Sequence, residues 1–463
     1  MAVCVDFGST FTKAALVDLD AGELLATTQH PTSIPDANGT GDVLDGYDAC
    51  LATLERAHPL ARDARTLACS SAGGGLRIAV LGNEALVTAE AGRRVALSSG
   101  GKVVATLSTD RRSGELDATL TETRPDVLLL TGGTDGGDSE AVMAAAREIA
   151  TSRWDGPVVV AGNADAREEV AGLLARLPHV LADNLVPRIG VLAPDSARRA
   201  IREMFLSHVI GGKHLSSRAD FASMVLGATP DVVLTGVELL AGELLAGGEG
   251  SRAPGSGVVV VDVGGATTDV HSVVLIDPEE GTLSHEVVAT APVTRTVEGD
   301  LGMRWSAATT AAAAGEAGLD VPADAVRRAA DPAYVPDTDE ARVGDEALAT
   351  AATVLAVRRH AGRSRVVLSP TGRVVERTGK DLRAVELVVG SGGVLRSADP
   401  EAARRILAAA TGPDPDGWQL PERPRLVVDS GYVLAAAGLL GLGDDRAREQ
   451  ARLLVCNSLS RWR

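Results

Sequence analysis

The chain has 463 residues and a formal net charge of −17 at neutral pH; 45% of its residues are hydrophobic and only 2% are aromatic. This length exceeds the size at which one hydrophobic core stops growing, so we expect two or three domains with cores built from Ala, Val and Leu. The acidic charge argues against nucleic acid or an anionic membrane surface as the main partner, because both require basic patches.

Neither the membrane nor the secretory pathway is indicated by the sequence. No apolar run reaches the roughly 18–20 residues of a membrane-spanning helix, and the N-terminus enters a strand without the basic region of a signal peptide. The four cysteines are scattered and form no C-x-x-C pair. We therefore expect a reduced, cytoplasmic protein without a zinc or iron–sulfur site.

Residues 1–84 predict the first part of an N-terminal lobe. Alternating hydrophobic residues predict a hairpin over residues 1–30, and an amphipathic pattern predicts a helix over residues 42–58. The stretch "TLACSSAGGGLRIAVLG" reads as two buried strands around a Gly cluster.

Residues 85–205 predict an inserted α/β module. Strands alternate with helices here, as in "DVLLLTGGTDGG" followed by "SEAVMAAAREIA" and "GPVVVAGN" followed by "DAREEVAGLLARL". This alternation predicts a parallel sheet with right-handed crossovers. Its Gly turn either exposes amides to a ligand at a helix N-terminus or forms a tight, well-capped turn.

Residues 206–256 predict the second part of the N-terminal lobe and a connection, and residues 257–463 a C-terminal lobe. The connection consists of a helix over residues 231–246 and a Gly/Ser/Pro linker, "GGEGSRAPGSG". The C-terminal lobe contains a hydrophobic strand that leads into a Gly turn, "AVELVVGSGGVLRS". Its main predicted helices are "ARVGDEALATAATVLAVRRHAG", "PEAARRILAAA" and "VLAAAGLLGL".

One phrase occurs twice in the chain. "VCVDFGSTFTKAALVDLDAGELLA" near the N-terminus and "VVVVDVGGATTDVHSVVLIDPEEGTL" later both give a strand, an Asp, a Gly turn with Ser/Thr, a second strand and an acidic-Gly turn. Two copies separated by the length of a domain predict two halves of similar fold.

The repeated phrase has the chemistry of a nucleotide site. A tight hairpin turn presents N–H groups and hydroxyls to phosphate, and Gly8, Gly264 and Gly265 let the backbone approach closely. Asp6 and Asp262 are placed to hold Mg²⁺ through its waters. Two such loops from opposite lobes would grip one ATP, and no P-loop motif is present as an alternative.

The chain resembles the glutamate mutase MutL (GlmL) family of the actin, sugar-kinase and heat-shock-chaperone ATPase superfamily. The resembling stretches spread over most of the chain: "CVDFGSTFTKAALVD", "CSSAGGGLRIAVLG", "LLTGGTDGGDSEAV", "VVDVGGATTDVHSV", "RTVEGDLGMRWSA" and "GKDLRAVELVVGSGGVL". The resemblance implies two actin-like, ribonuclease-H-like ATPase lobes around a nucleotide cleft, with the βαβ module inserted.

The resemblance also implies site residues. The phosphate-1 motif corresponds to Asp6, Gly8, Ser9, Thr10 and Lys13; phosphate-2 to Asp262, Gly264, Gly265 and Thr267; and the adenosine turn to Gly390, Gly392 and Gly393. Glu238 lies where a carboxylate helps to position the attacking water in chaperone ATPases, or else on a solvated helix face. The charged residues Glu298, Asp300 and Arg304 of "VEGDLGMR" are open to three interpretations: a structural ion network, a nucleotide contact or a partner contact.

The function implied is that of a reactivation chaperone, a slow Mg-dependent ATPase that releases damaged cobalamin from an adenosylcobalamin-dependent mutase or aminomutase. The inserted module would transmit ATP-driven movement to this client. Two other functions stay open: a small-molecule kinase and a nucleotide-gated binding module with negligible hydrolysis. A reductive activator is disfavoured, because it holds a cysteine-ligated iron–sulfur cluster and the sequence offers no plausible cysteine pair. The sequence indicates neither the client's identity nor the oligomeric state.

Overall fold

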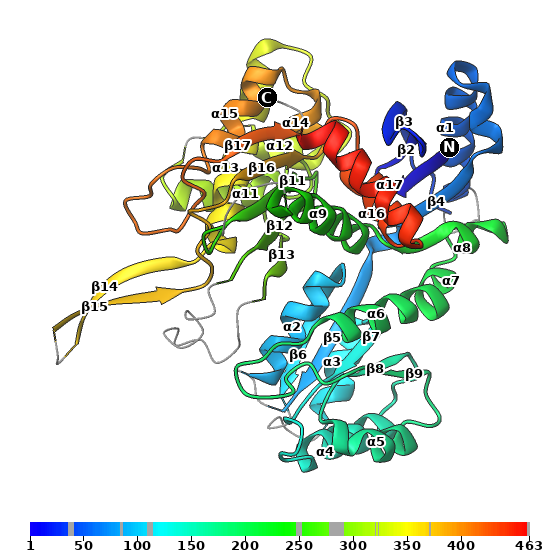
Figure 1. The fold of residues 1–463 in the computed structure, drawn as a ribbon, viewed down its shortest axis with the longest axis vertical. Helices are drawn as coiled ribbons and strands as arrows, with labels where there is room; N and C mark the ends of the chain where they lie inside the picture. Colours follow the sequence, from blue (N-terminus) through cyan, green and yellow to red (C-terminus); the bar gives the residue numbers. More distant parts are fainter. Residues whose placement is uncertain are drawn as a thin grey trace. The chain divides into compact units, whose positions relative to one another are not determined.

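The chain folds into two compact units, which are described separately below (Figure 1). The computed structural model describes residues 1–35, 41–83, 87–108, 114–246, 252–276, 291–319, 321–322, 324–369 and 372–460. Unit 1 holds the described residues of 1–236 and 433–457, and unit 2 holds those of 237–432 and 458–460.

Each unit contains a five-stranded sheet, and the two sheets have the same topology. In both, the first two strands form an antiparallel hairpin, the third strand adds antiparallel to the second, and two later strands add parallel on the other side of the first. In unit 1 these are β1 (Ala2–Phe7), β2 (Phe11–Asp18), β3 (Glu23–Pro31), β4 (Arg65–Ser70) and β10 (Val225–Ala228). In unit 2 they are β11 (Gly257–Val263), β12 (Thr268–Val274), β13 (Val293–Glu298), β16 (Leu387–Ser391) and β17 (Arg425–Val428).

This duplication confirms the predicted α/β fold with two actin-like lobes. The first strand of each sheet is central, which explains its composition. The sequence "AVCVDF" of β1 is buried along its whole length, and "GVVVVDV" of β11 is buried except at Asp262. Continuous runs of β-branched residues are typical of strands covered on both faces. The edge strand β3 is instead largely exposed or half-buried.

The inserted module is a doubly wound parallel sheet between β4 and β10 of unit 1. Its strand order is β6-β5-β7-β8-β9, and every neighbouring pair is parallel. The strands are β5 (Leu76–Gly82), β6 (Gly101–Ser108), β7 (Val127–Leu130), β8 (Val158–Val160) and β9 (His179–Leu181). The inserted sheet thus begins with β5, before the expected boundary at residue 85, because this strand pairs with β6 and β7 rather than with β4.

Helices cover both faces of the inserted sheet. Side chains of α2 (Thr88–Ser98) and α6 (Asp195–Met204) share a hydrophobic core with one face. Side chains of α3 (Glu115–Thr123), α4 (Glu140–Thr151) and α5 (Arg167–Leu173) pack on the other face. Strands that alternate between the two cores, such as β7, are therefore apolar at every position.

The remaining helices follow local sequence signals. In α1 (Val43–Ala57), Asp42 and Asp45 form a capping box. In α13 (Asp339–His360), Thr338 caps the N-terminus, and the last turn is basic, as the helix dipole favours. The others are α7 (Ile210–Gly212), α8 (Asp220–Met224), α9 (Thr229–Ala246), α11 (Ala307–Glu316), α12 (Ala325–Ala330), α14 (Gly393–Ser397), α15 (Pro400–Ala408), α16 (Val433–Gly441) and α17 (Asp445–Val455). None of the described helices combines the length and apolarity needed to cross a bilayer.

Most predicted elements are present. The N-terminal hairpin and the helices predicted near residues 42–58, 139–150, 231–246 and 341–362 are confirmed by β1–β2, α1, α4, α9 and α13. The strand pair β14 (Arg363–Ser369) and β15 (Gly372–Thr378) was not predicted. Residues 247–251 of the predicted linker and residues 277–283 of the second repeated phrase lie outside the described residues.

Unit 2 buries two histidines against β12 and β13. His360 Nδ1 lies 2.9 Å from Thr296 Oγ1, and His360 Nε2 lies 2.8 Å from Ser272 Oγ. His271 is 1% exposed, and its Nδ1 has no hydrogen-bond partner in the described part of the chain. Burial lowers the pKa of both imidazoles, and the cations of Arg295 and Lys380 lower it further.

These histidines predict that the protein loses stability between pH 7.5 and pH 5.5. Both pKa values lie below the ordinary value near 6.5 in the folded state, so the unfolded state takes up protons first as the pH falls. The free energy of unfolding should decrease by up to about 1.4 kcal/mol per pH unit for each histidine. Chemical denaturation at the two pH values measures this slope.

A His271→Leu variant should show a smaller pH slope over this window, because one of the two proton-binding groups is then absent from the unfolded state. An equal slope in the variant and the unsubstituted protein would show that His271 does not titrate differently on unfolding.

Candidate functional site

The first repeated phrase forms a tight turn between β1 and β2. The Gly8 N–H donates to the Phe11 carbonyl at 3.2 Å. A Cβ at Gly8 would lie 2.7 Å from that same oxygen, closer than real Cβ atoms approach. The turn therefore requires glycine at position 8.

Thr32 holds the carbonyl side of this turn. Its N–H donates to the Thr10 carbonyl and its hydroxyl donates to the Gly8 carbonyl, both at 2.9 Å. Within the described residues, the N–H groups of Ser9 and Thr10 donate to no protein acceptor, and both residues are exposed. Two carbonyls of the turn, those of Gly8 and Thr10, are thus occupied, while the N–H groups of two exposed residues remain.

Asp6 lies beneath this turn and is almost buried. Its carboxylate accepts from Lys13 Nζ at 3.3 Å and from the Thr229 hydroxyl, at the start of α9, at 2.6 Å. Cys69 Sγ on β4 lies 3.7 Å from the same carboxylate. Burial, together with the neighbouring Asp6 charge, raises the pKa of the Cys69 thiol well above its ordinary value, so the thiol stays protonated.

The Gly cluster after β4 is adjacent to the same turn. The Ser9 hydroxyl donates to the Ser71 carbonyl at 3.1 Å, and the Ser71 N–H donates to the Phe7 carbonyl. Three consecutive glycines, Gly73, Gly74 and Gly75, then have positive φ angles of 68°, 90° and 69°. Such a run is restricted to glycine, and it keeps side chains away from the space beside Ser9.

The second repeated phrase forms an equivalent turn in unit 2, between β11 and β12. The Gly264 N–H donates to the Thr267 carbonyl at 2.9 Å, and a Cβ at Gly264 would lie 2.8 Å from that oxygen. In the described part of unit 2, the N–H groups of Gly265, Ala266 and Thr267 have no protein acceptor. The two turns therefore share both their closing hydrogen bond and their outward-facing donors.

The segment "GMRWS" holds the carbonyl side of the second turn. The Met303 N–H donates to Gly264 O at 3.0 Å, and the Arg304 N–H donates to Gly265 O at 2.8 Å. The Ser306 hydroxyl donates to Ala266 O at 2.6 Å. This segment fills the role that Thr32 has in unit 1, which gives the unusual stretch "VEGDLGMRWS" a structural function.

The third glycine turn lies beside the second. Asp262 and Ser391 are register partners in the parallel pair β11–β16. Gly392, with φ 98°, follows directly, and a Cβ there would collide with the Val263 carbonyl and lie 2.9 Å from Asp262 Oδ1. Gly390 is buried on β16, and Gly393 begins α14. The predicted phosphate-2 and adenosine residues of unit 2 are thus brought together at one edge of its sheet.

A further group at this edge was missed by sequence reasoning. After β17, Asp429 is buried and Tyr432 has a φ of 56°, rare for a residue other than glycine. The Arg396 guanidinium lies 3.6 Å from the centre of the Tyr432 ring, and its Nε donates to the Ser430 carbonyl. Burial lowers the pKa of Arg396. The sequence contained a signal for this group, because "VVDSGY" again places an Asp and a Gly after a strand.

The charged residues of "VEGDLGMR" form ion networks in the structure. Arg359 donates to Glu298 at 2.8 Å and to Asp300 at 2.7 and 2.9 Å. Burial raises the pKa of Glu298, whereas the hydrogen bond from Arg359 lowers that of Asp300. Of the three interpretations left open by the sequence, the structure supports an ion network for these groups.

Arg304 belongs to a separate, more deeply buried network. Its guanidinium donates to both oxygens of Asp345, at 3.1 and 2.8 Å, and lies 5.5 Å from the centre of the Tyr334 ring. Arg328, which is 1% exposed, also donates to Asp345. One carboxylate on α13 thus pairs with two arginines, of which Arg328 is also bound to Asp324 at 2.9 Å, and it fixes the segment that holds the second turn.

Two further carboxylates, those of Asp269 and Glu238, are candidates for a role in catalysis. Asp269, the last residue of "DVGGATTD", is bound by Arg295 at 2.7 Å on the neighbouring strand, so its charge is already balanced. Glu238 lies half-buried on α9.

The residues present suit a magnesium nucleotide better than a protein-held metal. Among the described residues, no group of three His, Cys, Asp or Glu side chains is arranged to hold a metal ion. Mg²⁺ needs no such cage, because it is bound through one or two carboxylates, its own waters and substrate phosphates. Asp6 and Asp262, each next to a turn with outward N–H groups, fit that pattern.

Comparison with known protein families identifies the family of this chain. A model of the family described as MutL protein matches residues 2–456. The chain belongs to the MutL protein family. A curated relative, Protein MutL of Clostridium tetanomorphum, is 35% identical over 470 residues, which cover 97% of this chain and 98% of the relative.

Among solved structures, the similarities are distant. The ethanolamine utilization protein EutJ of Carboxydothermus hydrogenoformans is 10% identical with a TM-score of 0.29, over 95% of this chain and 89% of that chain. The ROK hexokinase of Thermus thermophilus is 14% identical with a TM-score of 0.25, over 98% and 99% of the two chains. The fold assignment stands on the duplicated sheet topology and not on these overlaps.

The Asp345 network predicts a large effect of one substitution. In an Asp345→Ala variant, the largely buried Arg304 guanidinium loses its carboxylate partner and the buried Arg328 keeps only its pair with Asp324, so the free energy of unfolding should fall by about 3–5 kcal/mol. Asp339→Ala, on the same helix, is the matched control, because Asp339 is 98% exposed in its ion pair with Arg342 and such pairs contribute about 0–1 kcal/mol. Equal stabilities of the two variants in urea denaturation would contradict this account.

Proposed function

We propose that this protein binds MgATP with both glycine turns and hydrolyses it slowly, as a reactivation chaperone for an adenosylcobalamin-dependent mutase or aminomutase of the glutamate mutase type. In this function, ATP drives the release of damaged cobalamin from the client. Membership of the MutL protein family and the duplicated turns support the proposal.

The observation that carries it is the shared hydrogen-bonding of the two turns. In each, at least two carbonyl oxygens of the turn accept from a following segment, and successive N–H groups remain for an anion. Successive free amides form a cradle for phosphate oxygens. We propose that the two turns hold the phosphates of the same nucleotide.

The carboxylates have distinct roles in this proposal. Asp6 and Asp262 would hold Mg²⁺ through its waters, and the ion supplies charge neutralisation of the phosphates. The ion pair with Lys13 would hold the Asp6 carboxylate in place. Glu238 would help to position the attacking water. Because no strong nucleophile belongs to this set, catalysis would rest on positioning and charge, and we expect slow turnover.

The environment of Asp269 favours this function over a kinase of the same superfamily. A kinase requires a carboxylate that accepts a proton from the acceptor hydroxyl. Asp269 is the obvious candidate in the second phrase, but its carboxylate is already engaged in a 2.7 Å ion pair with Arg295. Water is then the expected acceptor.

Substitution of Asp262 is predicted to remove the contribution of magnesium to binding. In an Asp262→Asn variant, the ion loses an anionic partner, and MgATP affinity should fall at least about tenfold while affinity for metal-free ATP changes little. Isothermal titration calorimetry with and without Mg²⁺ separates the two effects, and Asp339→Asn is the exposed control. Unchanged MgATP affinity in a folded Asp262→Asn protein would exclude this role.

The chaperone function is tested with a client mutase whose cobalamin has been damaged in place. With ATP, the protein should release the damaged cobalamin and restore mutase activity once fresh adenosylcobalamin is added, whereas a non-hydrolysable analogue should not. ADP should form without any small-molecule acceptor. ADP formation that depends on an acceptor would identify a kinase, and no cleavage in a single turnover would identify a nucleotide-gated binding module.

A further inference from the structure

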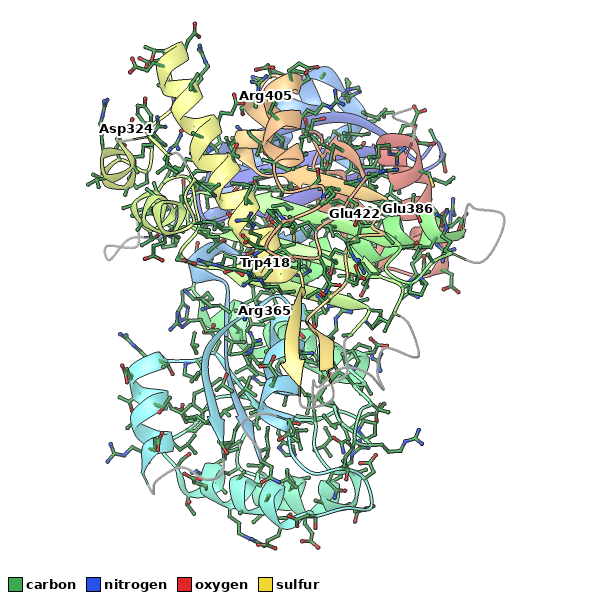
Figure 2. The ribbon with its side chains drawn as sticks, turned by 90° about the vertical axis from the view of Figure 1, so that its left-hand side faces the viewer. Asp324, Arg365, Glu386, Arg405, Trp418 and Glu422 are labelled. Atoms are coloured by element: carbon green, nitrogen blue, oxygen red, sulfur yellow. The ribbon has the colours of Figure 1, made fainter. Side chains whose placement is uncertain are left out.

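The strand pair β14–β15 extends away from the rest of unit 2 as a two-stranded ribbon (Figures 1 and 2). We call these two strands, residues 363–369 and 372–378, the basic arm. Its strands pair from Arg363–Thr378 at the root to Ser369–Gly372 at the far end. Among the described elements, neither strand has an extended packing contact except with the other.

The root of the arm is rigid. The Gly362 N–H donates to the Lys380 carbonyl, and Gly379, with φ 71°, approaches so closely that a Cβ there would lie 2.7 Å from Gly362 Cα. The chain therefore enters and leaves the arm through two touching glycines.

A third segment fixes the direction of the arm. The Ser364 N–H donates to the Gly417 carbonyl at 2.8 Å, and Arg363 Nε donates to the Asp416 carbonyl at 2.8 Å. The Arg363 guanidinium lies 4.9 Å from the centre of the Trp418 ring, near the root in Figure 2. The root of the arm is thus held both by its own two ends and by residues 416–418, which sets the direction in which the arm leaves unit 2.

The arm differs in charge from the rest of the chain. It contains four arginines, Arg363, Arg365, Arg373 and Arg377, against one acidic residue, Glu376, which gives a net charge of +3. Since the whole chain carries −17, the remainder carries −20. A carboxylate-rich partner would thus be attracted by the arm and repelled by the body, so that the arm alone would set where it docks.

The middle of the arm contains two pairs of valines. Val366 is the register partner of Val375, and Val367 is the register partner of Val374. An isolated two-stranded ribbon is only marginally stable in water, and its free edges are templates for pairing. An apolar centre flanked by arginines has the composition of a protein interface.

Charge and symmetry select the kind of partner. Two arms pairing with each other would bring like charges together, and an arm docking on the acidic body of a second copy would form a head-to-tail contact, which generates open filaments unless a ring closes. Nucleic acid is disfavoured by the −20 of the remaining chain, and the arm has no aromatic residue on which bases could stack. Of the partners considered, a second copy of this chain and nucleic acid are therefore disfavoured, and a different protein is the partner that fits the arm.

We propose that the basic arm is the docking element for the client protein, and that it binds an apolar strip flanked by carboxylates on the client's surface. This inference rests on the proposed function, because it identifies the client as the mutase. It assigns docking to the arm and leaves nucleotide binding to the two turns.

The test measures binding of the purified full-length chain to the purified mutase by biolayer interferometry at 50 and 300 mM salt. The first variant, Val367→Asp with Arg373→Glu and Arg377→Glu, reverses both features of the arm. The second replaces residues 365–376 by Asn-Gly, a dipeptide that closes tight hairpins, and keeps the root. The control, Val343→Asp with Arg446→Glu, changes a valine and an arginine that are 65% and 81% exposed elsewhere.

Both arm variants should bind the mutase at least tenfold more weakly, with MgATP affinity unchanged as evidence of folding, and the control should bind within twofold of the unsubstituted chain. Affinity of the unsubstituted chain should fall with salt, and that of the first variant less so. Mutase binding that survives both arm variants would overturn this inference and leave the proposed function standing.

Two other outcomes would also overturn the arm assignment. One is an arm variant that changes the oligomeric state of the chain alone in light scattering; the other is binding of a 20-base-pair DNA duplex that is lost with the arm. Absence of mutase binding by the unsubstituted chain would instead remove the proposed function and this inference together.

Discussion

The candidate site depends on which side of each glycine turn is already hydrogen-bonded. A hairpin turn has both donors and acceptors, and it binds an anion only when its acceptors are satisfied elsewhere and its N–H groups remain. Thr32 meets this condition in unit 1 and the Met303–Ser306 segment in unit 2. Two unrelated segments therefore have the same effect on two turns of the same topology: they bind carbonyl oxygens and leave N–H groups for an anion. Each turn also has a buried or half-buried Asp at its base.

The turns themselves were predictable, and the groups that polarise them were not. Gly8 and Gly264 are required by local geometry, and their surrounding phrase repeats in the sequence. Met303 acts through its backbone N–H and Thr32 partly so, and a backbone N–H leaves no residue signature. Thr229 and Cys69 reach Asp6 only because β4 and β10 lie beside β1 in the sheet.

Two misreadings have equally specific causes. The strand 76–82 was attributed to the N-terminal lobe because the Gly cluster before it resembles a turn within one sheet, whereas three positive-φ glycines carry the chain into a new sheet. The basic arm was missed because its signal is short: each strand has only one Val-Val pair, and the long helix before the arm dominated the local pattern. The local sequence pattern predicted most helices and strands correctly. It failed where pairing between strands distant in sequence decided which sheet a strand joins.

The central claim is that both turns hold one nucleotide, and the stoichiometry of MgATP binding tests it most directly. Calorimetry should give one MgATP per chain. Gly8→Val and Gly264→Val, whose Cβ atoms would meet the turn's own carbonyl in different units, should each abolish that single event while the protein stays folded. Two nucleotides per chain, or a variant that removes only one of two binding events, would contradict the account.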